Sequence, residues 1–187
     1  MHEEIQKALD VLKVGGVILY PTDTVWGLGC DATNENAVKK IFEIKQRSES
    51  KSLIVLAADE HQLTRYVKDV PSIAWELMEV SERPMTIVYS NVSGLADNVI
   101  AEDKSAAIRI PKDEFCINLI RQFRKPIVST SANISGKPAP GNFHEISKEI
   151  KSKVDYIVNH RQDGMLRGAP SSIIKLSEKG EVRVLRK

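Results

Sequence analysis

Residues 126–137 read Pro-Ile-Val-Ser-Thr-Ser-Ala-Asn-Ile-Ser-Gly-Lys. The apolar pair Ile127-Val128 is typical of a buried strand. Four hydroxyl side chains and one carboxamide follow it directly, within residues 129–135. Each hydroxyl offers one hydrogen-bond donor and two acceptors, and an asparagine offers both kinds of group. A strand that leads into so dense a polar cluster indicates a site for oxyanions or small polar ligands.

On both sides of this stretch, helical spacing of apolar residues alternates with short apolar runs. The spacing predicts helices near residues 5–12, 37–42, 59–68, 71–80, 115–123 and 143–151. The apolar runs predict strands at 17–20, 53–56, 85–89, 106–110 and 156–158, a closing hairpin of 172–176 and 182–185 with its turn at 177–180, and a polar loop from 21 to 31. This alternation predicts one α/β domain over residues 1–187, built on a mixed rather than a purely parallel sheet.

The composition is typical of a soluble globular protein, with 42% hydrophobic and 28% charged residues among 187. No stretch approaches the length of a membrane span, and the polar N-terminus lacks a signal-peptide pattern, so we expect a cytoplasmic protein. Cys30 and Cys116 stand far apart in sequence, and we expect two reduced, buried thiols. The four histidines show no metal-ligand spacing, so a metal site built by the protein itself is not expected.

Charge is distributed unevenly along the chain. Residues 1–120 contain 13 Lys and Arg against 19 Asp and Glu, a net charge of −6. Residues 121–187 contain 14 against 6, a net charge of +8. This asymmetry fits either an ordinary surface or a basic surface that faces a polyanion such as a nucleotide or RNA.

Two common nucleotide-binding motifs are not supported. Gly27-Leu28-Gly29-Cys30-Asp31-Ala32 formally matches the dinucleotide fingerprint, but six residues separate it from the preceding predicted strand. The fingerprint requires the strand to lead straight into the glycines. Gly136-Lys137 is followed by proline, where a Walker A motif needs Ser or Thr for magnesium.

Three further features have both a structural and a functional interpretation. Thr22 and Thr24 either cap turn amides or present hydroxyls at the end of a strand. The cations Lys45, Arg47 and Lys51 either complement a helix dipole or form a phosphate clamp. Arg109 interrupts an apolar strand, so it either points outward or reaches an anion.

Together these segments resemble the YrdC family, the threonylcarbamoyl-AMP synthases, over nearly the whole chain and in the family's order. Six segments carry the resemblance: residues 19–29 (LYPTDTVWGLG), 45–47 (KQR), 85–86 (MT), 107–111 (AIRIP), 129–136 (STSANISG) and 171–174 (SSII). The resemblance implies a twisted mixed β-sheet flanked by helices, with a concave basic cavity.

The resemblance also implies a reaction. L-threonine, bicarbonate and ATP, with Mg²⁺ accompanying the ATP, would give threonylcarbamoyl-AMP and pyrophosphate. A separate tRNA threonylcarbamoyl transferase complex would then modify the adenosine next to the anticodon. The implied catalytic residues are Lys45 and Arg47. The implied substrate-binding residues are Thr22, Thr24, Arg109 and Ser171, and the implied nucleotide-binding residues are Thr86, Ser129, Ser131, Asn133 and Arg186.

Two alternative functions stay open. The first is a related protein of the same fold that acts on another carbamoyl or acyl substrate. The second is a non-catalytic RNA-binding module that uses the basic cavity. Weak binding of tRNA or other RNA is also expected as a possible property of the enzyme itself. Only four Phe and no basic stripe interleaved with aromatic residues argue against the second.

Overall fold

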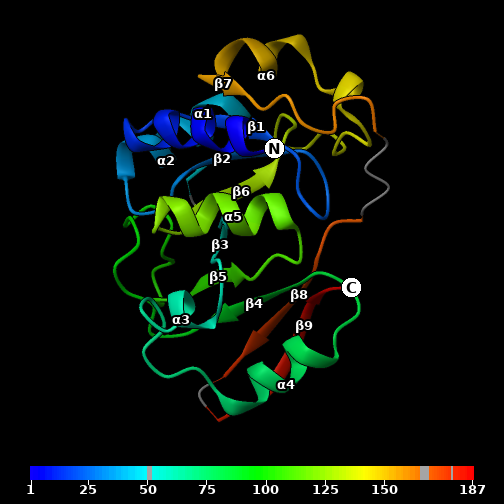
Figure 1. The fold of residues 1–187 in the computed structure, drawn as a ribbon. Helices are drawn as coiled ribbons and strands as arrows, with labels where there is room; N and C mark the ends of the chain where they lie inside the picture. The colour runs from blue at the N-terminus through cyan, green and yellow to red at the C-terminus, as the bar shows by residue number, and fades with distance from the viewer. Residues whose placement is uncertain (50–51, 165–168, 178) are drawn as a thin grey trace.

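A computed structural model describes residues 1–49, 52–164, 169–177 and 179–187 of the chain. Within these ranges, nine strands form one sheet in the order β7-β1-β2-β6-β3-β5-β4-β8-β9 (Figure 1). The strands are β1 (Ile18–Tyr20), β2 (Gly27–Asp31), β3 (Ile54–Leu56), β4 (Met85–Tyr89), β5 (Ala106–Arg109), β6 (Ile127–Ser131), β7 (Tyr156–Ile157), β8 (Ser172–Leu176) and β9 (Val182–Arg186).

The sheet is mixed, as the sequence predicts. The pairs β1–β7, β3–β5 and β4–β8 are parallel. The pairs β1–β2, β2–β6, β3–β6, β4–β5 and β8–β9 are antiparallel. Strand β6, which carries the polar cluster, lies between β2 and β3 near the middle of the sheet. It pairs with β3 up to Ser129 and with β2 up to Ser131.

The helices are α1 (His2–Lys13), α2 (Glu35–Lys45), α3 (Glu60–Leu63), α4 (Ser72–Val80), α5 (Glu114–Phe123) and α6 (Lys148–Lys153), with a 3₁₀ turn at Phe143–Glu145. Side-chain caps explain several starts: Asn34 accepts a hydrogen bond from the amide of Ala37 at α2, and Asp113 accepts one from the amide of Cys116 at α5.

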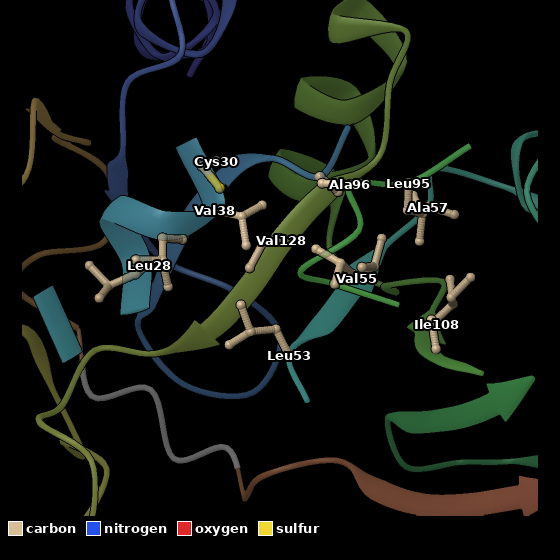
Figure 2. Packing of buried hydrophobic residues seen from close by; sticks show 14 of the residues in the cluster. Leu28, Cys30, Val38, Leu53, Val55, Ala57, Leu95, Ala96, Ile108 and Val128 are labelled. Carbon is tan, nitrogen blue, oxygen red and sulfur yellow. The ribbon is translucent and has the colours of Figure 1, made fainter. Parts of the chain in front are cut away.

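Strands β1, β2 and β5 are buried at every residue, so both of their faces are covered, whereas the edge strand β9 is exposed. Ile18 and Tyr20 pack with apolar residues of α1 and α5, whereas Val17 and Leu19 pack with the cluster that includes α2. In Figure 2, Leu28 of β2, Val128 of β6 and Val55 of β3 lie together in that second cluster. The core therefore fixes the strand ends from both sides.

Several predicted boundaries differ from the structure. The predicted loop 21–31 is wrong in its second half, because residues 27–31 form the fully buried strand β2. The glycines of this segment favour a loop in the sequence alone, but in the folded chain they allow close packing. A Cβ on Gly29 would lie 2.7 Å from Cε1 of Tyr20. The helix predicted at 59–68 is regular only over α3, and the segment 143–151 divides into the 3₁₀ turn and α6. The predicted turn 177–180 includes residue 178, which lies outside the described residues.

Both cysteines are free and buried, as expected. Burial raises the pKa of the Cys30 and Cys116 thiols, so neither is a ready nucleophile. In the described ranges, no helix has the length and apolar character needed to cross a membrane.

Candidate functional site

A cavity of about 200 Å³ opens where several strands begin or end. Strand β6 contributes its last three residues, 129–131. Arg109 is the last residue of β5, Arg186 is the last residue of β9, and Ser171 immediately precedes β8. Segments distant in sequence therefore meet at one polar site.

One wall of the cavity is the loop after β1. The hydroxyls of Thr22 and Thr24 lie 2.9 Å apart, and both side chains are buried. The Thr22 hydroxyl also accepts a hydrogen bond from the Thr24 amide and donates one to the main-chain oxygen of Val25. This local network fixes the loop and presents two hydroxyls at the cavity.

The part of the cavity wall formed by Gly27 and Ser129, here called the floor, is held by a contact between β1 and β6. The hydroxyl of Tyr20 donates to Oγ of Ser129 over 2.8 Å. A Cβ on Gly27, the first residue of β2, would lie 3.3 Å from the same Oγ, so a side chain there would crowd the floor. The contribution of Tyr20 is missing from the sequence prediction, because an aromatic residue at the end of an apolar run indicates only core packing.

Two arginines contribute buried cationic donors. Within the described part of the chain, the Nε atoms of Arg47 and Arg109 are buried without a hydrogen-bond partner, and both residues line the cavity. Arg47 also donates from Nη2 to the main-chain oxygen of Ser52, and burial lowers the pKa of its guanidinium. A buried donor left unpaired costs free energy, so these two groups indicate a site that an anion completes.

Of the two orientations predicted for Arg109, the structure shows the inward one, in which the side chain reaches an anion. Its side chain is 4% exposed and forms an ion pair with Asp23. The other oxygen of Asp23 accepts from the Lys112 amide at 3.0 Å. Asp23 is absent from the predicted site because turn chemistry alone explains an aspartate between two threonines.

A third arginine reaches the site from the last described strand. Arg186 donates from Nε and Nη2 to the main-chain oxygen of Ser171, at 2.9 and 2.7 Å. The Ser171 hydroxyl lies 2.7 Å from that of Thr86, which is completely buried behind it. Burial lowers the pKa of Arg186. Thr86 thus supports Ser171 and is not among the residues that line the cavity.

Lys45 lies behind the cavity and faces the polar loop. Its side chain is 1% exposed, and Nζ donates to the main-chain oxygens of Ser131 and Asn133. The carboxamide of Asn133 donates to main-chain oxygens of Ile134 and Lys137. Burial, together with the charge of Arg47, lowers the pKa of Lys45 to about 8. Lys45 and Asn133 are therefore close to one another but not among the lining residues.

The structure thus brings most of the predicted site residues to one place. The predicted residues that line the cavity are Thr22, Thr24, Arg47, Arg109, Ser129, Ser131, Ser171 and Arg186. Lys45, Thr86 and Asn133 lie directly behind this lining. Lys51, the third cation of the predicted clamp, is outside the described residues.

The charged side chains among the described lining residues are all cationic. None of the described lining residues is acidic, and the carboxylate of Asp23 behind them already faces Arg109 and the Lys112 amide. In the described ranges, no group of three or more His, Cys, Asp and Glu is arranged to hold a metal ion. The arginines and hydroxyls of the lining are suited to an anionic ligand.

The fold and the cavity define an α/β protein with a pocket of arginines and hydroxyls at the strand ends of a mixed sheet, and this lining is chemically suited to an anionic ligand. The family model described as "Telomere recombination", which covers Sua5, YciO and YrdC, matches residues 10–187. The chain belongs to this Sua5/YciO/YrdC family.

Relatives and solved structures agree with this assignment. The threonylcarbamoyl-AMP synthase of Vibrio cholerae is 34% identical over 174 residues, covering 91% of this chain and 92% of that protein. The Pyrococcus abyssi threonylcarbamoyl-AMP synthase is 33% identical over 176 residues, covering 94% of this chain and 51% of that protein. The structure of P. abyssi Sua5 complexed with L-threonine has a TM-score of 0.88 at 34% identity, covering 97% of this chain and 53% of that one. The chain therefore spans about half of the P. abyssi relative and nearly all of the V. cholerae one.

Proposed function

We propose that this chain is a threonylcarbamoyl-AMP synthase. In the proposed reaction, the threonine amine and bicarbonate condense to a carbamate with loss of water. A carbamate oxygen then attacks the α-phosphorus of ATP, and pyrophosphate leaves. The relatives' names support this class of product, and the threonine complex of P. abyssi Sua5 supports threonine as a substrate.

The observation that carries the proposal is the pair of buried, unpartnered guanidinium Nε atoms of Arg47 and Arg109 at one cavity. The reaction needs no covalent intermediate with the protein, and the buried thiols provide no activated nucleophile. It does need fixed positive charge where charge develops on phosphate and carbamate oxygens. Arginines held in the wall of the cavity supply that charge with little rearrangement during the reaction.

We assign the residues roles by their position. Arg47 holds the triphosphate and the carbamate, and Lys45 fixes the polar loop while its charge lies behind that anion site. Ser129 and Ser131 serve the nucleotide end with Asn133 behind them, and Arg186 closes that side. Thr22, Thr24, Arg109 and Ser171 serve threonine and bicarbonate, with Thr86 supporting Ser171.

Mg²⁺ would enter with ATP. A cavity without acidic lining residues fits an ion held by the phosphates themselves. When bound, the ion neutralises phosphate charge and makes pyrophosphate a better leaving group. The protein's own task is then to orient the α-phosphate toward the carbamate and to keep water away.

The product must be consumed by a transfer reaction, because a mixed anhydride of a carbamate and a phosphate is an activated acyl donor. We propose that a tRNA threonylcarbamoyl transferase takes it, in the cytoplasm. Direct RNA binding by the basic cavity is a separate property, which titration with tRNA at several salt concentrations would measure.

The first experiment is pyrophosphate release from ATP by the purified chain, with threonine and bicarbonate present together, singly, or absent. Release that requires both supports the proposal, and incorporation of labelled bicarbonate into a nucleotide product identifies the bond formed. If ATP binds but the two co-substrates make no difference, the proposal is wrong. Screening other amines and carbamoyl donors would then test the alternative of a different substrate.

A further inference from the structure

Asp23 connects two walls of the cavity without lining it. It lies between Thr22 and Thr24 in the loop after β1, and its side chain is 12% exposed. Oδ1 accepts a hydrogen bond from Nη1 of Arg109, at the end of β5. The carboxylate therefore joins the loop that presents the hydroxyl pair to the strand end that presents the guanidinium.

The second oxygen of this carboxylate is anchored independently. Oδ2 of Asp23 accepts from the main-chain amide of Lys112 at 3.0 Å. The ammonium of Lys112 in turn donates to the main-chain oxygen of Ser81, at the end of α4. Both carboxylate oxygens are thus engaged, so Asp23 cannot rotate to follow Arg109 if the arginine moves.

Arg109 needs such an anchor. Its side chain is 4% exposed, and leaving a cation buried without a counter-charge is strongly destabilising. A guanidinium is a planar fork, so fixing one nitrogen and the plane also fixes the directions of its other donors. In the described residues, Nε of Arg109 is one donor without a partner.

We propose that Asp23 is a positioning residue, which holds the guanidinium of Arg109 in the orientation that receives a carboxylate group of the substrates. The inference rests on the proposed function. Two substrate groups share this chemistry: the carboxylate of threonine and the carboxylate formed from bicarbonate. Arg109 binds the anion, and Asp23 acts through Arg109.

Asp23→Asn gives a test in which two physical effects have opposite signs. The asparagine can still accept from Arg109 but cannot accept at both ends, so the anchored geometry is lost. Removing the negative charge alone would strengthen the attraction of the site for an anion and lower KM. Loss of orientation raises KM, by about tenfold if one charge-assisted hydrogen bond is lost. We expect a rise in KM for threonine or bicarbonate, while KM for ATP changes by less than about twofold.

Two more variants separate positioning from stability. In an Arg109→Lys background the planar fork is absent, so Asp23→Asn should change the same KM by less than about twofold. Asp23→Glu keeps the carboxylate and should recover part of the loss. Asp31→Asn is the matched control: Asp31 is also buried, accepts from the Thr33 amide and Lys125, and is not among the cavity-lining residues. It should lower Tm and leave the KM values unchanged.

The outcomes are distinct from those that test the reaction itself. If the wild-type chain shows no threonine- and bicarbonate-dependent pyrophosphate release, the proposed function fails before Asp23 is examined. If the wild type is active, a KM rise confined to threonine or to bicarbonate supports the inference and identifies the carboxylate. An unchanged or lower KM for both, an equal rise for ATP, or a full effect in the Arg109→Lys background would overturn it.

Discussion

The ammonium of Lys45, at the end of α2, lies 2.7 Å from the main-chain oxygen of Asn133 and also bonds to that of Ser131. A lysine at the end of α2 thus holds the loop that follows β6, and this loop carries the Ser and Asn side chains of the polar cluster. The sequence shows the two segments 88 residues apart and gives no sign of this contact. The contact places the charge of Lys45 in the interior, beside the cavity.

The first prediction concerns how the stability of the protein depends on pH through the ionisation of Lys45. Burial lowers the pKa of Lys45 to about 8, whereas in the unfolded chain it has its ordinary value of 10.5. Between these values the unfolded state binds more protons, so stability rises with pH. Compared with Lys45→Met, the wild-type free energy of unfolding should gain about 2 kcal/mol from pH ~7.5 to ~9.5. Urea denaturation of both proteins at the two pH values measures this, and a difference that stays constant or shrinks would contradict the lowered pKa.

The second prediction concerns Arg47. Arg47→Gln removes a charged donor at the cavity and leaves a shorter, neutral polar side chain. We expect kcat/KM for ATP to fall about 10- to 100-fold, as for the loss of a charge-assisted hydrogen bond, with Tm lowered by only a few degrees. Arg121→Gln is the control, because Arg121 pairs with Asp59 and is not among the residues that line this cavity. Near-normal turnover in folded Arg47→Gln would remove Arg47 from the proposed clamp.

Much of the fold was predictable because local patterns and tertiary packing agree. Helices α2 and α5 have amphipathic spacing and capping residues, and β4 and β5 are apolar runs between polar ones. Strand β2 was missed because its Gly-rich sequence has poor strand propensity. There, packing against Tyr20 requires the small residues, and this requirement arises only when β1 and β2 are paired.

The site was only partly predictable from the sequence. The polar cluster and Arg109 break local expectations for a strand, so they stand out in the sequence alone, whereas the two threonines also fit an ordinary turn. Asp23 and Tyr20 satisfy local expectations, and their roles come from contacts with residues 86 and 109 positions away. Pairings at such separations depend on strand order, which local patterns do not encode.

The third prediction concerns the bond between Tyr20 and Ser129. Tyr20→Phe removes the buried donor to Ser129 Oγ, and should lower the free energy of unfolding by about 1–2 kcal/mol. Because Ser129 lines the cavity, KM for ATP should also rise. Tyr156→Phe is a matched control, since its hydroxyl donates to Glu4 away from the cavity. Loss of stability without any change in KM would mean that the bond does not orient Ser129 for a ligand.

The fourth prediction separates two glycines of β2. A Cβ at Gly29 would lie 2.7 Å from Cε1 of Tyr20 and 3.1 Å from the main-chain oxygen of Val128, so neither neighbour can yield easily. Gly29→Ala should therefore destabilise the protein by about 1–3 kcal/mol. At Gly27, which lines the cavity, the nearest atom would be Ser129 Oγ at 3.3 Å. Gly27→Ala should therefore cost less stability and impair ATP binding more.

Gly164→Ala provides the reference for both variants, because a Cβ there would have its nearest neighbour among the described residues, the main-chain oxygen of Arg161, at 3.7 Å. It should change Tm and KM very little. Thermal unfolding and steady-state kinetics of the three variants give the comparison. If Gly29→Ala is as stable as Gly164→Ala, the tight packing of β2 on Tyr20 is wrong. If Gly27→Ala binds ATP as well as the wild type, the nucleotide does not approach the floor formed by Gly27 and Ser129.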